Sequence, residues 1–412
     1  MSKRRIVFVC HTAAGESLRS ARAIANLDDV ELLGISQGSV SDDSFVDMRQ
    51  VVDVHDTQQL IDAARSYRTL HKIVTTQETL LLRVAEANEA LGLAAMSSET
   101  VKRTLDKSQL KATLRRAGIR TPRDQIVMTL ADAQQFAHAV GFPIVIKLAG
   151  GSGALTTFPI YNEAQLAHVI DLMQPPLIAE AFISGQELCF DTITIDNEPQ
   201  FHSLCEYNPS IIEALQDPEK QWQCVMPREI DEVYRDFIAH GLAAVRALQV
   251  GNAMTHMEGF MNGGFIDATL RPAGARIAPM FGFACDVDPY RVWARIAIDG
   301  CLDGPFERKY AVGTIFLRGH GSGVIEQVNT IENSLIVEAH WPRIGARKSP
   351  TYTGDGYVTV RHPDKDVVQH ALNLIHRSVK ITYSSSQSES PNPAALLHDY
   401  KSLNKPAWEA TL

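Results

Sequence analysis

The sequence predicts a fold that combines α/β and α+β organisation, with a parallel α/β domain first and a mixed segment last. Three observations support this prediction. Strand and helix patterns alternate over the first hundred residues. Two strand patterns flank Asn262-Gly263, as expected of an antiparallel hairpin. The chain also has 412 residues, too many for one compact core.

Residues 1–100 are predicted to form the parallel domain. Arg5 to Cys10 is a short, apolar and β-branched run, as expected of a strand buried on both faces. Strand and helix signals then alternate, at residues 5–10, 15–25, 31–35, 57–67, 71–75 and 78–91. This order predicts parallel strands joined by helices.

Residues 101–290 are predicted to form a second domain, with a small lid subdomain at about 118–190. Helices are expected at 108–117, 131–140 and 231–248, and strands at 141–147, 177–181, 188–195, 253–260 and 264–269. The segment 208–228 is expected to be irregular. Residues 291–383 are predicted to complete the fold with mixed strands and a helix at 366–375, and residues 384–412 to form a flexible tail.

Composition excludes several classes of protein. Hydrophobic residues make up 45% and charged residues 21%, which is ordinary for a globular protein, and the net charge of -9 disfavours nucleic acid as a partner. No apolar run approaches the roughly 18 residues of a membrane span. The six cysteines form no CxxC pair and are interpreted as reduced, buried thiols. We therefore expect a cytoplasmic protein without membrane or nucleic-acid partners.

Two lysines are candidates for binding phosphate. Lys147 ends an apolar strand and precedes a glycine-rich turn that contains Gly150, Gly151, Ser152, Gly153 and Ala154. Glycines let backbone N–H groups approach anionic oxygens, and the lysine supplies a point charge. Lys107 opens a helix that carries Lys111 on the same face. The alternative is that these lysines are solvated.

The segment from Leu177 to Glu187 is suited to an adenine slot. Backbone groups of Glu180, Ala181 and Ile183 are predicted to read the purine edge, between apolar side chains. Glu187 is predicted to accept ribose hydroxyls. The alternative is an amphipathic strand with exposed glutamates.

The predicted hairpin carries the strongest signal. Glu258 and Asp267 would face each other across two strands, where like charges repel unless a cation lies between them. Mg²⁺ prefers carboxylate and phosphate oxygens. Arg271 follows four residues later, and its guanidinium could hold a phosphoryl group. Unrelated surface charges on a polar hairpin are the alternative.

The order of these motifs resembles the ATP-grasp superfamily, in particular its carboxylate–amine ligases, such as the bacilysin-type L-amino acid ligases, and their biotin-carboxylase-like relatives. The resemblance implies an ATP-grasp fold with a Rossmann-like N-terminal domain. It implies that Lys107 and Lys147 contact ATP phosphates and that the loop from Gly150 to Ala154 closes over them. Adenine would bind at Glu180, Ala181 and Ile183, and ribose at Glu187.

The resemblance also assigns the metal half of the site. Glu258, Asp267 and Thr269 would bind Mg²⁺, with Mn²⁺ as the alternative, and Arg271 and Lys147 would act in catalysis. Asp267 stands where the family usually has glutamate, and Thr269 where it usually has asparagine, which puts full two-metal occupancy in doubt. His256 and Arg276 are weaker candidates for lining the acyl site.

The expected activity is ATP-dependent ligation of a small carboxylate to an amine through an acyl phosphate, with ADP and phosphate as products. Two alternatives stay open: a carboxylase-like enzyme that activates bicarbonate, and an ATP-binding protein that has lost catalysis. The resemblance also allows a homodimer.

Overall fold

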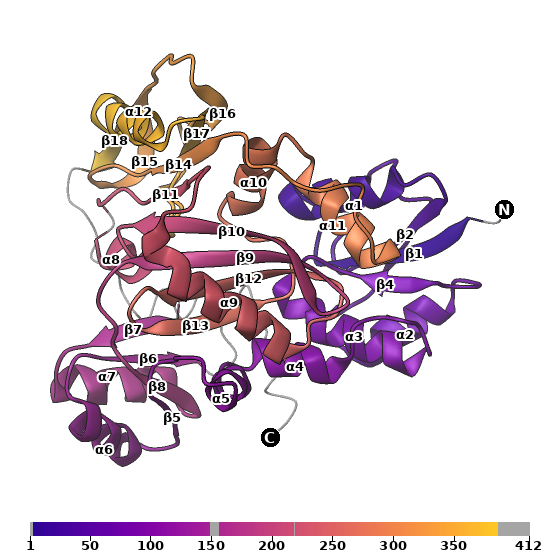
Figure 1. Ribbon diagram of the computed structural model, residues 1–412, viewed down its shortest axis with the longest axis horizontal. Coiled ribbons are helices and arrows are strands. Elements are labelled where there is room, and N and C mark those ends of the chain that lie inside the picture. The colour runs from indigo at the N-terminus through magenta and orange to yellow at the C-terminus, as the bar shows by residue number, and fades with distance from the viewer. Residues whose placement is uncertain (1–2, 149–155, 218, 386–412) are drawn as a thin grey trace.

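The computed structural model describes residues 3–148, 156–217 and 219–385. The predicted loop from Gly150 to Ala154 lies outside these residues. So does the predicted tail, apart from residues 384 and 385, which end strand β18. The described part contains no helix that is long and apolar enough to cross a membrane. Figure 1 shows three regions: an N-terminal sheet, a large central sheet and a small sheet beneath it.

The N-terminal region is a parallel sheet in the order β3-β2-β1-β4. Its elements are β1 (Arg4–Cys10), α1 (Gly15–Ala25), β2 (Val30–Ser36), β3 (Asp47–Gln50), α2 (Thr57–Arg65), β4 (Lys72–Val74), a 3₁₀ turn (Glu78–Leu80) and α3 (Leu81–Ala90). Alternate residues of β1 face the two sides of the sheet. Phe8 packs with α1 and α11, and Val7 with α2 and α3. The sequence missed β3, which is short and polar.

The small sheet is antiparallel, in the order β5-β8-β6-β7. It comprises β5 (Asp124–Val127), α6 (Leu130–Val140), β6 (Ile144–Leu148), β7 (Thr157–Ile160), α7 (Glu163–Met173) and β8 (Leu177–Ala181). One face packs on α6 and α7, which leaves the other face, with Lys147 and Glu180, turned toward the large sheet. Helices α4 (Ser98–Leu105) and α5 (Lys107–Arg116) precede it.

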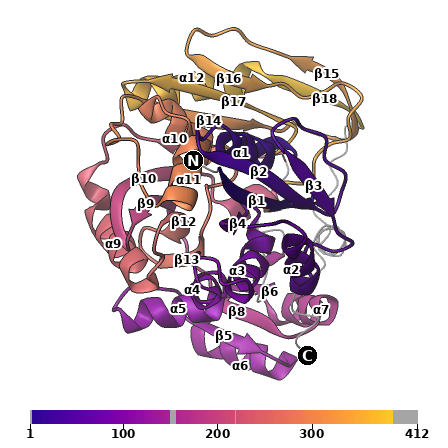
Figure 2. The same ribbon diagram turned by 90° about the vertical axis from the view of Figure 1, so that its right-hand side faces the viewer.

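The large sheet has eight antiparallel strands, in the order β13-β12-β9-β10-β11-β14-β17-β16. They are β9 (Glu187–Ile195), β10 (Glu198–Asn208), β11 (Gln223–Met226), β12 (Ala253–Phe260), β13 (Gly264–Thr269), β14 (Ala311–Leu317), β16 (Ile336–His340) and β17 (Gly356–His362). Helices α4, α5 and α9 (Arg235–Leu248) cover one face, and α10 (Ile277–Cys285) and α11 (Pro289–Asp299) pack on the other. Figure 2 shows the small sheet at one end and the C-terminal elements at the other.

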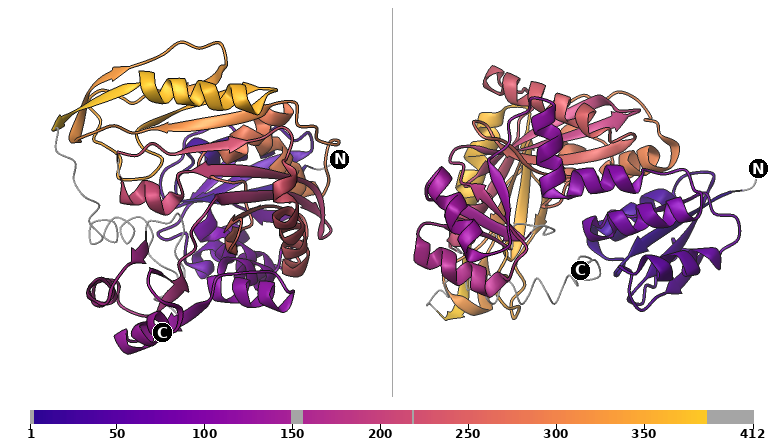
Figure 3. Two further views of the ribbon diagram at one scale, coloured as in Figure 1. Left: turned by 60° about the vertical axis from the view of Figure 1, so that its left-hand side comes forward. Right: turned by 90° about the horizontal axis from the view of Figure 1, so that it is seen from below.

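The C-terminal elements are β15 (Ser322–Asn329), which pairs with β18 (Lys380–Ser385), and α12 (Lys365–Ser378), which packs on β14 and β17. Figure 3 shows the N-terminal sheet set apart from this end of the molecule. Contacts with α11 attach that sheet to the rest. Phe8 meets Trp293 edge-on at 6.3 Å between ring centroids, and Lys72 donates to the carbonyl of Ala297 at 2.8 Å.

The expectation of an irregular segment at 208–228 is wrong. It contains α8 (Ile211–Gln216) and β11, a strand in the middle of the large sheet. Ser210 and Glu213 form a capping box that begins α8. Trp222, just before β11, is completely buried among Tyr207, Phe316 and Tyr352. Burial of this indole anchors the segment immediately before β11.

Candidate active site

A cleft lies between the small sheet and the large sheet, and we call it the central cleft. It gathers residues from α5, β6, β8, β9, α8, β12 and β13. Eight residues predicted from the sequence line it: Lys107, Lys147, Glu180, Ala181, Ile183, Glu187, Glu258 and Asp267. Apolar side chains, including those of Leu148, Phe182 and Ile212, line it as well. A cleft with cations, carboxylates and apolar surface suits a nucleotide, which has a planar base and an anionic tail.

Three buried lysines lie together at this cleft: Lys107 and Lys147 line it, and Lys111 lies behind them. Lys107 begins α5, Lys111 follows one turn later, and Lys147 projects from β6; none is more than 5% exposed. Lys147 Nζ lies 2.7 Å from one oxygen of Glu180, and Lys111 pairs with the other. The sequence noted Lys111 on the face of Lys107 but did not assign it to the site. The structure makes it a partner of the same carboxylate.

Crowding of these lysines shifts their proton affinities. Burial and repulsion by Lys111 and Lys107 hold the pKa of Lys147 well below its usual value. Burial likewise lowers the pKa of Lys111 to about 8. The single carboxylate of Glu180, which Lys111 and Lys147 share, does not offset the lowering of their pKa values by burial and mutual repulsion. An incoming polyanion would therefore restore charge to these amines, which favours phosphate binding at this part of the cleft.

Glu180 is 4% exposed, so the alternative of an exposed glutamate in an amphipathic strand is wrong. Its strand pairs with β5 and β6 on either side. The backbone N–H of Ala181 donates to Arg123 at 2.9 Å. Within the described ranges, no backbone hydrogen bond uses the N–H of Ile183. The edge of the segment that can meet a ligand therefore begins at Ile183.

Glu187 is also buried, at the start of β9. The backbone N–H of Ile211 donates to its carboxylate at 2.7 Å. Burial raises the pKa of Glu187 to about 8, and repulsion by Glu258 acts in the same direction. Without a ligand, this carboxyl group is protonated through much of the neutral range, and it can then both donate and accept hydrogen bonds.

The hairpin of β12 and β13 places Glu258 directly opposite Asp267, as the sequence spacing predicts. Their carboxylates have different partners. Asp267 Oδ2 lies 2.5 Å from Lys107 Nζ, whereas Glu258 accepts from the hydroxyl of Tyr207 at 3.2 Å. Although burial opposes it, the pairing with Lys107 holds the pKa of Asp267 below its ordinary value. Asp267 is therefore ionised and available to a cation.

Thr269 follows Asp267 on the same face of β13. Its side chain is buried, and within the described ranges its hydroxyl has no hydrogen-bond partner. A buried hydroxyl without a partner carries an energetic cost, which a ligand or ion could relieve. Glu258, Asp267 and Thr269 thus form a set of oxygen ligands that fits Mg²⁺. The unpaired hydroxyl of Thr269 is the observation that supports this fit.

Glu258 and Asp267 also line a second cavity, the side cavity, together with Tyr207, His256, Thr269, Arg271, Tyr352 and Glu78. Arg271 donates from Nε and Nη2 to Glu78, at 3.2 and 2.8 Å. The sequence predicted Arg271 but not Glu78, since no local pattern relates residues 193 positions apart. Tyr207 and Tyr352 were missed for the same reason.

The two weaker candidates for the acyl site, His256 and Arg276, lie in different places. His256 lines the side cavity, and its Nδ1 lies 2.6 Å from Asp191 Oδ1. Arg276 is not among the residues that line either cavity. It pairs with Glu338 and Glu16, and its guanidinium lies 4.6 Å from the ring centre of Tyr357. The structure therefore brings His256, but not Arg276, to the predicted acyl region.

Comparisons with known proteins agree with this geometry. Residues 106–187 match the family described as the carbamoyl-phosphate synthase L chain, ATP binding domain. The chain is 26% identical over 198 residues to the L-arginine-specific L-amino acid ligase of Bacillus subtilis, covering 45% of this chain and 46% of that protein. The matches to this ligase and to two other curated relatives each span half or less of the relative's own length.

Solved structures cover more of the chain. The L-amino acid ligase of Bacillus licheniformis superposes with a TM-score of 0.76 at 17% identity, over 93% of this chain and 100% of that one. The biotin carboxylase domain of the Hydrogenobacter thermophilus 2-oxoglutarate carboxylase, in complex with MgADP, ADP and bicarbonate, gives a TM-score of 0.65 at 15% identity, over 97% and 95%. These likenesses establish a shared fold.

Proposed function

We propose, from the membership of this chain in the ATP-grasp superfamily, that it is an ATP-dependent ligase that joins a small carboxylate to an amine. One observation carries the proposal. Two cavities that suit different ligands share Glu258 and Asp267. The central cleft suits ATP, and the side cavity suits the carboxylate that ATP activates. The shared carboxylates lie where a γ-phosphate would pass from one to the other.

The nucleotide would lie in the central cleft with its base near Ile183 and its phosphates near Lys107 and Lys147. The apolar side chains of Leu148 and Phe182 would contact the faces of the base. The buried carboxyl of Glu187 would bond ribose hydroxyls. Closure of the segment from Gly150 to Ala154 over the phosphates would exclude water.

Glu258, Asp267 and Thr269 would hold Mg²⁺, which neutralises charge on the transferred phosphoryl group. In the first step a carboxylate oxygen of the acid attacks the γ-phosphorus, and the bond to the β-phosphate oxygen breaks, which releases ADP. Lys147 stabilises the charge that develops on the phosphoryl oxygens. Arg271, fixed by Glu78, holds the resulting acyl phosphate.

In the second step the neutral amine attacks the acyl carbon. The bond to phosphate breaks, the amine loses a proton, and an amide and inorganic phosphate leave. No covalent intermediate with the protein is needed. The buried cysteines agree with this, since burial raises the pKa of Cys10 to about 12 and keeps it a thiol.

The test is a screen of paired amino acids and small acids for ADP and phosphate release. We expect ADP that depends on both an acid and an amine, with an amide of matching mass. AMP and pyrophosphate would exclude the acyl-phosphate route. Bicarbonate-dependent turnover without an amine would favour the carboxylase alternative. Thermal stabilisation by ATP with no ADP from any pair would favour an ATP-binding protein without catalysis.

A further inference from the structure

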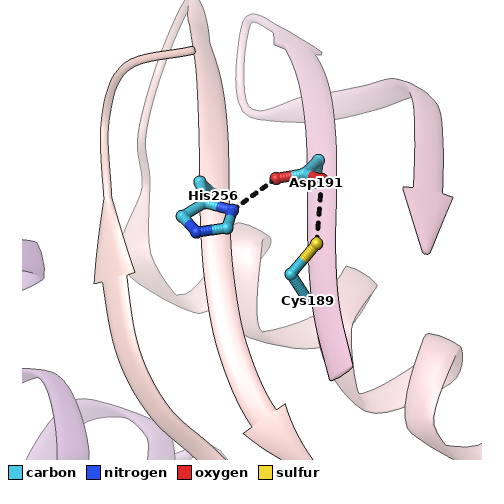
Figure 4. A group of neighbouring side chains, drawn as sticks. All are labelled: Cys189, Asp191 and His256. Atoms are coloured by element: carbon cyan, nitrogen blue, oxygen red, sulfur yellow. Dashed lines mark hydrogen bonds and ion pairs between the residues drawn. The ribbon is translucent and has the colours of Figure 1, made fainter. Parts of the chain in front are cut away.

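A cluster of three different side chains, Cys189, Asp191 and His256, lies next to the side cavity, which His256 lines. Cys189 and Asp191 project from β9, and His256 projects from the neighbouring β12 (Figure 4). In the register of the two strands His256 lies directly opposite Asp191, and Glu258 opposite Cys189. Since alternate residues of a strand share a face, the cluster is fixed by the sheet and needs no loop to assemble it.

The ligand atoms are close to one another. Asp191 Oδ1 lies 2.6 Å from His256 Nδ1, Asp191 Oδ2 lies 3.3 Å from Cys189 Sγ, and one ligand atom of each residue lies within 4.8 Å of the others. Two ligands of one tetrahedral zinc ion are roughly 3.3–3.6 Å apart, given zinc–ligand bonds of about 2.0–2.3 Å. Small rotations of these side chains would bring all three atoms to such separations.

We propose that Cys189, Asp191 and His256 form a binding site for Zn²⁺, separate from the Mg²⁺ set of Glu258, Asp267 and Thr269. Thiolate, imidazole and carboxylate are the ligand types that zinc takes, whereas Mg²⁺ prefers oxygen alone. Among the described residues this is the one group of three or more histidine, cysteine or acidic side chains with metal-ligand spacing.

The surroundings fit a metal site in two further ways. If His256 binds through Nδ1, its Nε2, 3.5 Å from Glu258, would donate to that carboxylate. A histidine ligand oriented by a carboxylate in this way is typical of zinc sites. Two of the three side chains also adjoin a cavity, because His256 lines the side cavity and Asp191 lines a small cavity that Arg271 lines as well. A water molecule from these cavities could supply the fourth ligand.

The competing explanation is a hydrogen-bonded network without metal. In that case the thiol of Cys189 donates to Asp191, and Asp191 pairs with His256, so that every member has a partner. Binding of Zn²⁺ replaces the thiol proton of Cys189, which leaves to solvent, and also frees Nδ1 of His256, whose proton moves to Nε2 or to solvent. The two explanations therefore differ in stoichiometric metal binding and in the formation of a metal–thiolate bond.

The experiment titrates the full-length, chelator-treated protein with Zn²⁺ and with Co²⁺ in excess Mg²⁺. We expect one tight site per chain and a cobalt–thiolate charge-transfer band in the near ultraviolet. Cys189→Ser should abolish the band, and Asp191→Asn should weaken binding by at least about 10-fold. The matched control is Cys285→Ser, which removes a buried thiol that lies outside the cluster and should leave the site intact.

X-ray absorption of the zinc-loaded wild-type protein tests the same site without relying on variants that could fail to fold. It should show one sulfur at about 2.3 Å with nitrogen and oxygen ligands. Absence of a tight site, displacement of the metal by millimolar Mg²⁺, a zinc spectrum without sulfur, or unchanged binding by Cys189→Ser would each overturn the proposal.

Discussion

The side-chain nitrogen of Lys147 lies 2.7 Å from the carboxylate of Glu180, which also pairs with Lys111. Lys147, predicted to bind phosphate, thus contacts Glu180, predicted to lie beside adenine. Phosphate binding would draw Lys147 away from Glu180, while Lys111 would keep that carboxylate neutralised. The pairing explains how a buried lysine can be held ready inside the protein before an anion arrives.

Replacing Lys147 with methionine should reduce kcat for ADP formation on the order of 100-fold, because a charge that stabilises the transferred phosphoryl group is lost. The fold should survive, since Lys111 still neutralises Glu180. Steady-state kinetics and thermal unfolding would measure the two effects. Lys102→Met is the matched control, because Lys102 lies half exposed on α4, away from both cavities. Equal losses in the two variants would contradict the role of Lys147.

Thr269→Val should raise the Mg²⁺ concentration needed for half-maximal activity several-fold without lowering stability. The hydroxyl has no hydrogen-bond partner within the described ranges, so an isosteric methyl group removes an unsatisfied polar atom and a metal ligand together. Thr255→Val is the control: its hydroxyl is likewise buried and unpaired there, but it lines neither the central cleft nor the side cavity. An unchanged Mg²⁺ requirement in Thr269→Val would exclude this hydroxyl as a ligand.

Glu78→Gln should lower kcat by about 10-fold and leave KM for ATP nearly unchanged. The neutral amide holds Arg271 less firmly, and Arg271 lines the side cavity rather than the central cleft. Initial-rate kinetics with ATP and the acid varied separately would show which parameter moves. Glu99→Gln, at an exposed position on α4, should have no effect. A rise confined to KM for ATP would show that Glu78 acts through the nucleotide instead.

The stability of the ligand-free protein should decrease between pH 5 and pH 8 because of Glu187. Burial raises its pKa in the folded protein from the ordinary 4.5 of an exposed carboxyl group to about 8. Between these values the folded state keeps a proton that the unfolded state has released, so the free energy of unfolding falls as the pH rises. Urea unfolding across this range should show a smaller slope for Glu187→Gln. An exposed control, Glu229→Gln, should keep the wild-type slope.

Local patterns predicted the parts of the site that neighbouring residues determine. Lys147 could be chosen as a candidate for phosphate binding because it lies between an apolar strand and a glycine-rich turn. The spacing of Glu258 and Asp267 around Asn262-Gly263 predicts their pairing, and the structure reaches it through a register shift between Glu258 and Gly259. The order of the motifs along the chain was also sufficient to predict the ATP-grasp fold.

Contacts between segments that are distant in the sequence could not be predicted from local patterns. Glu78 and Arg271 meet because the N-terminal region packs against the large sheet, and no periodicity encodes that contact. The segment around Trp222 was expected to be irregular, because its polar residues hide a strand that forms only when β10 and β14 lie on either side. The pairing of Asp191 with His256 could not be predicted for the same reason, because β9 and β12 are neighbours in the sheet but not in the sequence.

The packing of Phe8 on Trp293 and the bond between Glu78 and Arg271 have a consequence for dissecting the protein. A fragment beginning near residue 100 would retain all three clustered lysines and the β12–β13 hairpin. It would nevertheless expose the indole of Trp293, which is 4% exposed in the whole chain, and it would lack the carboxylate that pairs with the guanidinium of Arg271. The first hundred residues therefore contribute both to the buried core and to the proposed active site, and we expect a fragment that lacks them to aggregate and to be inactive.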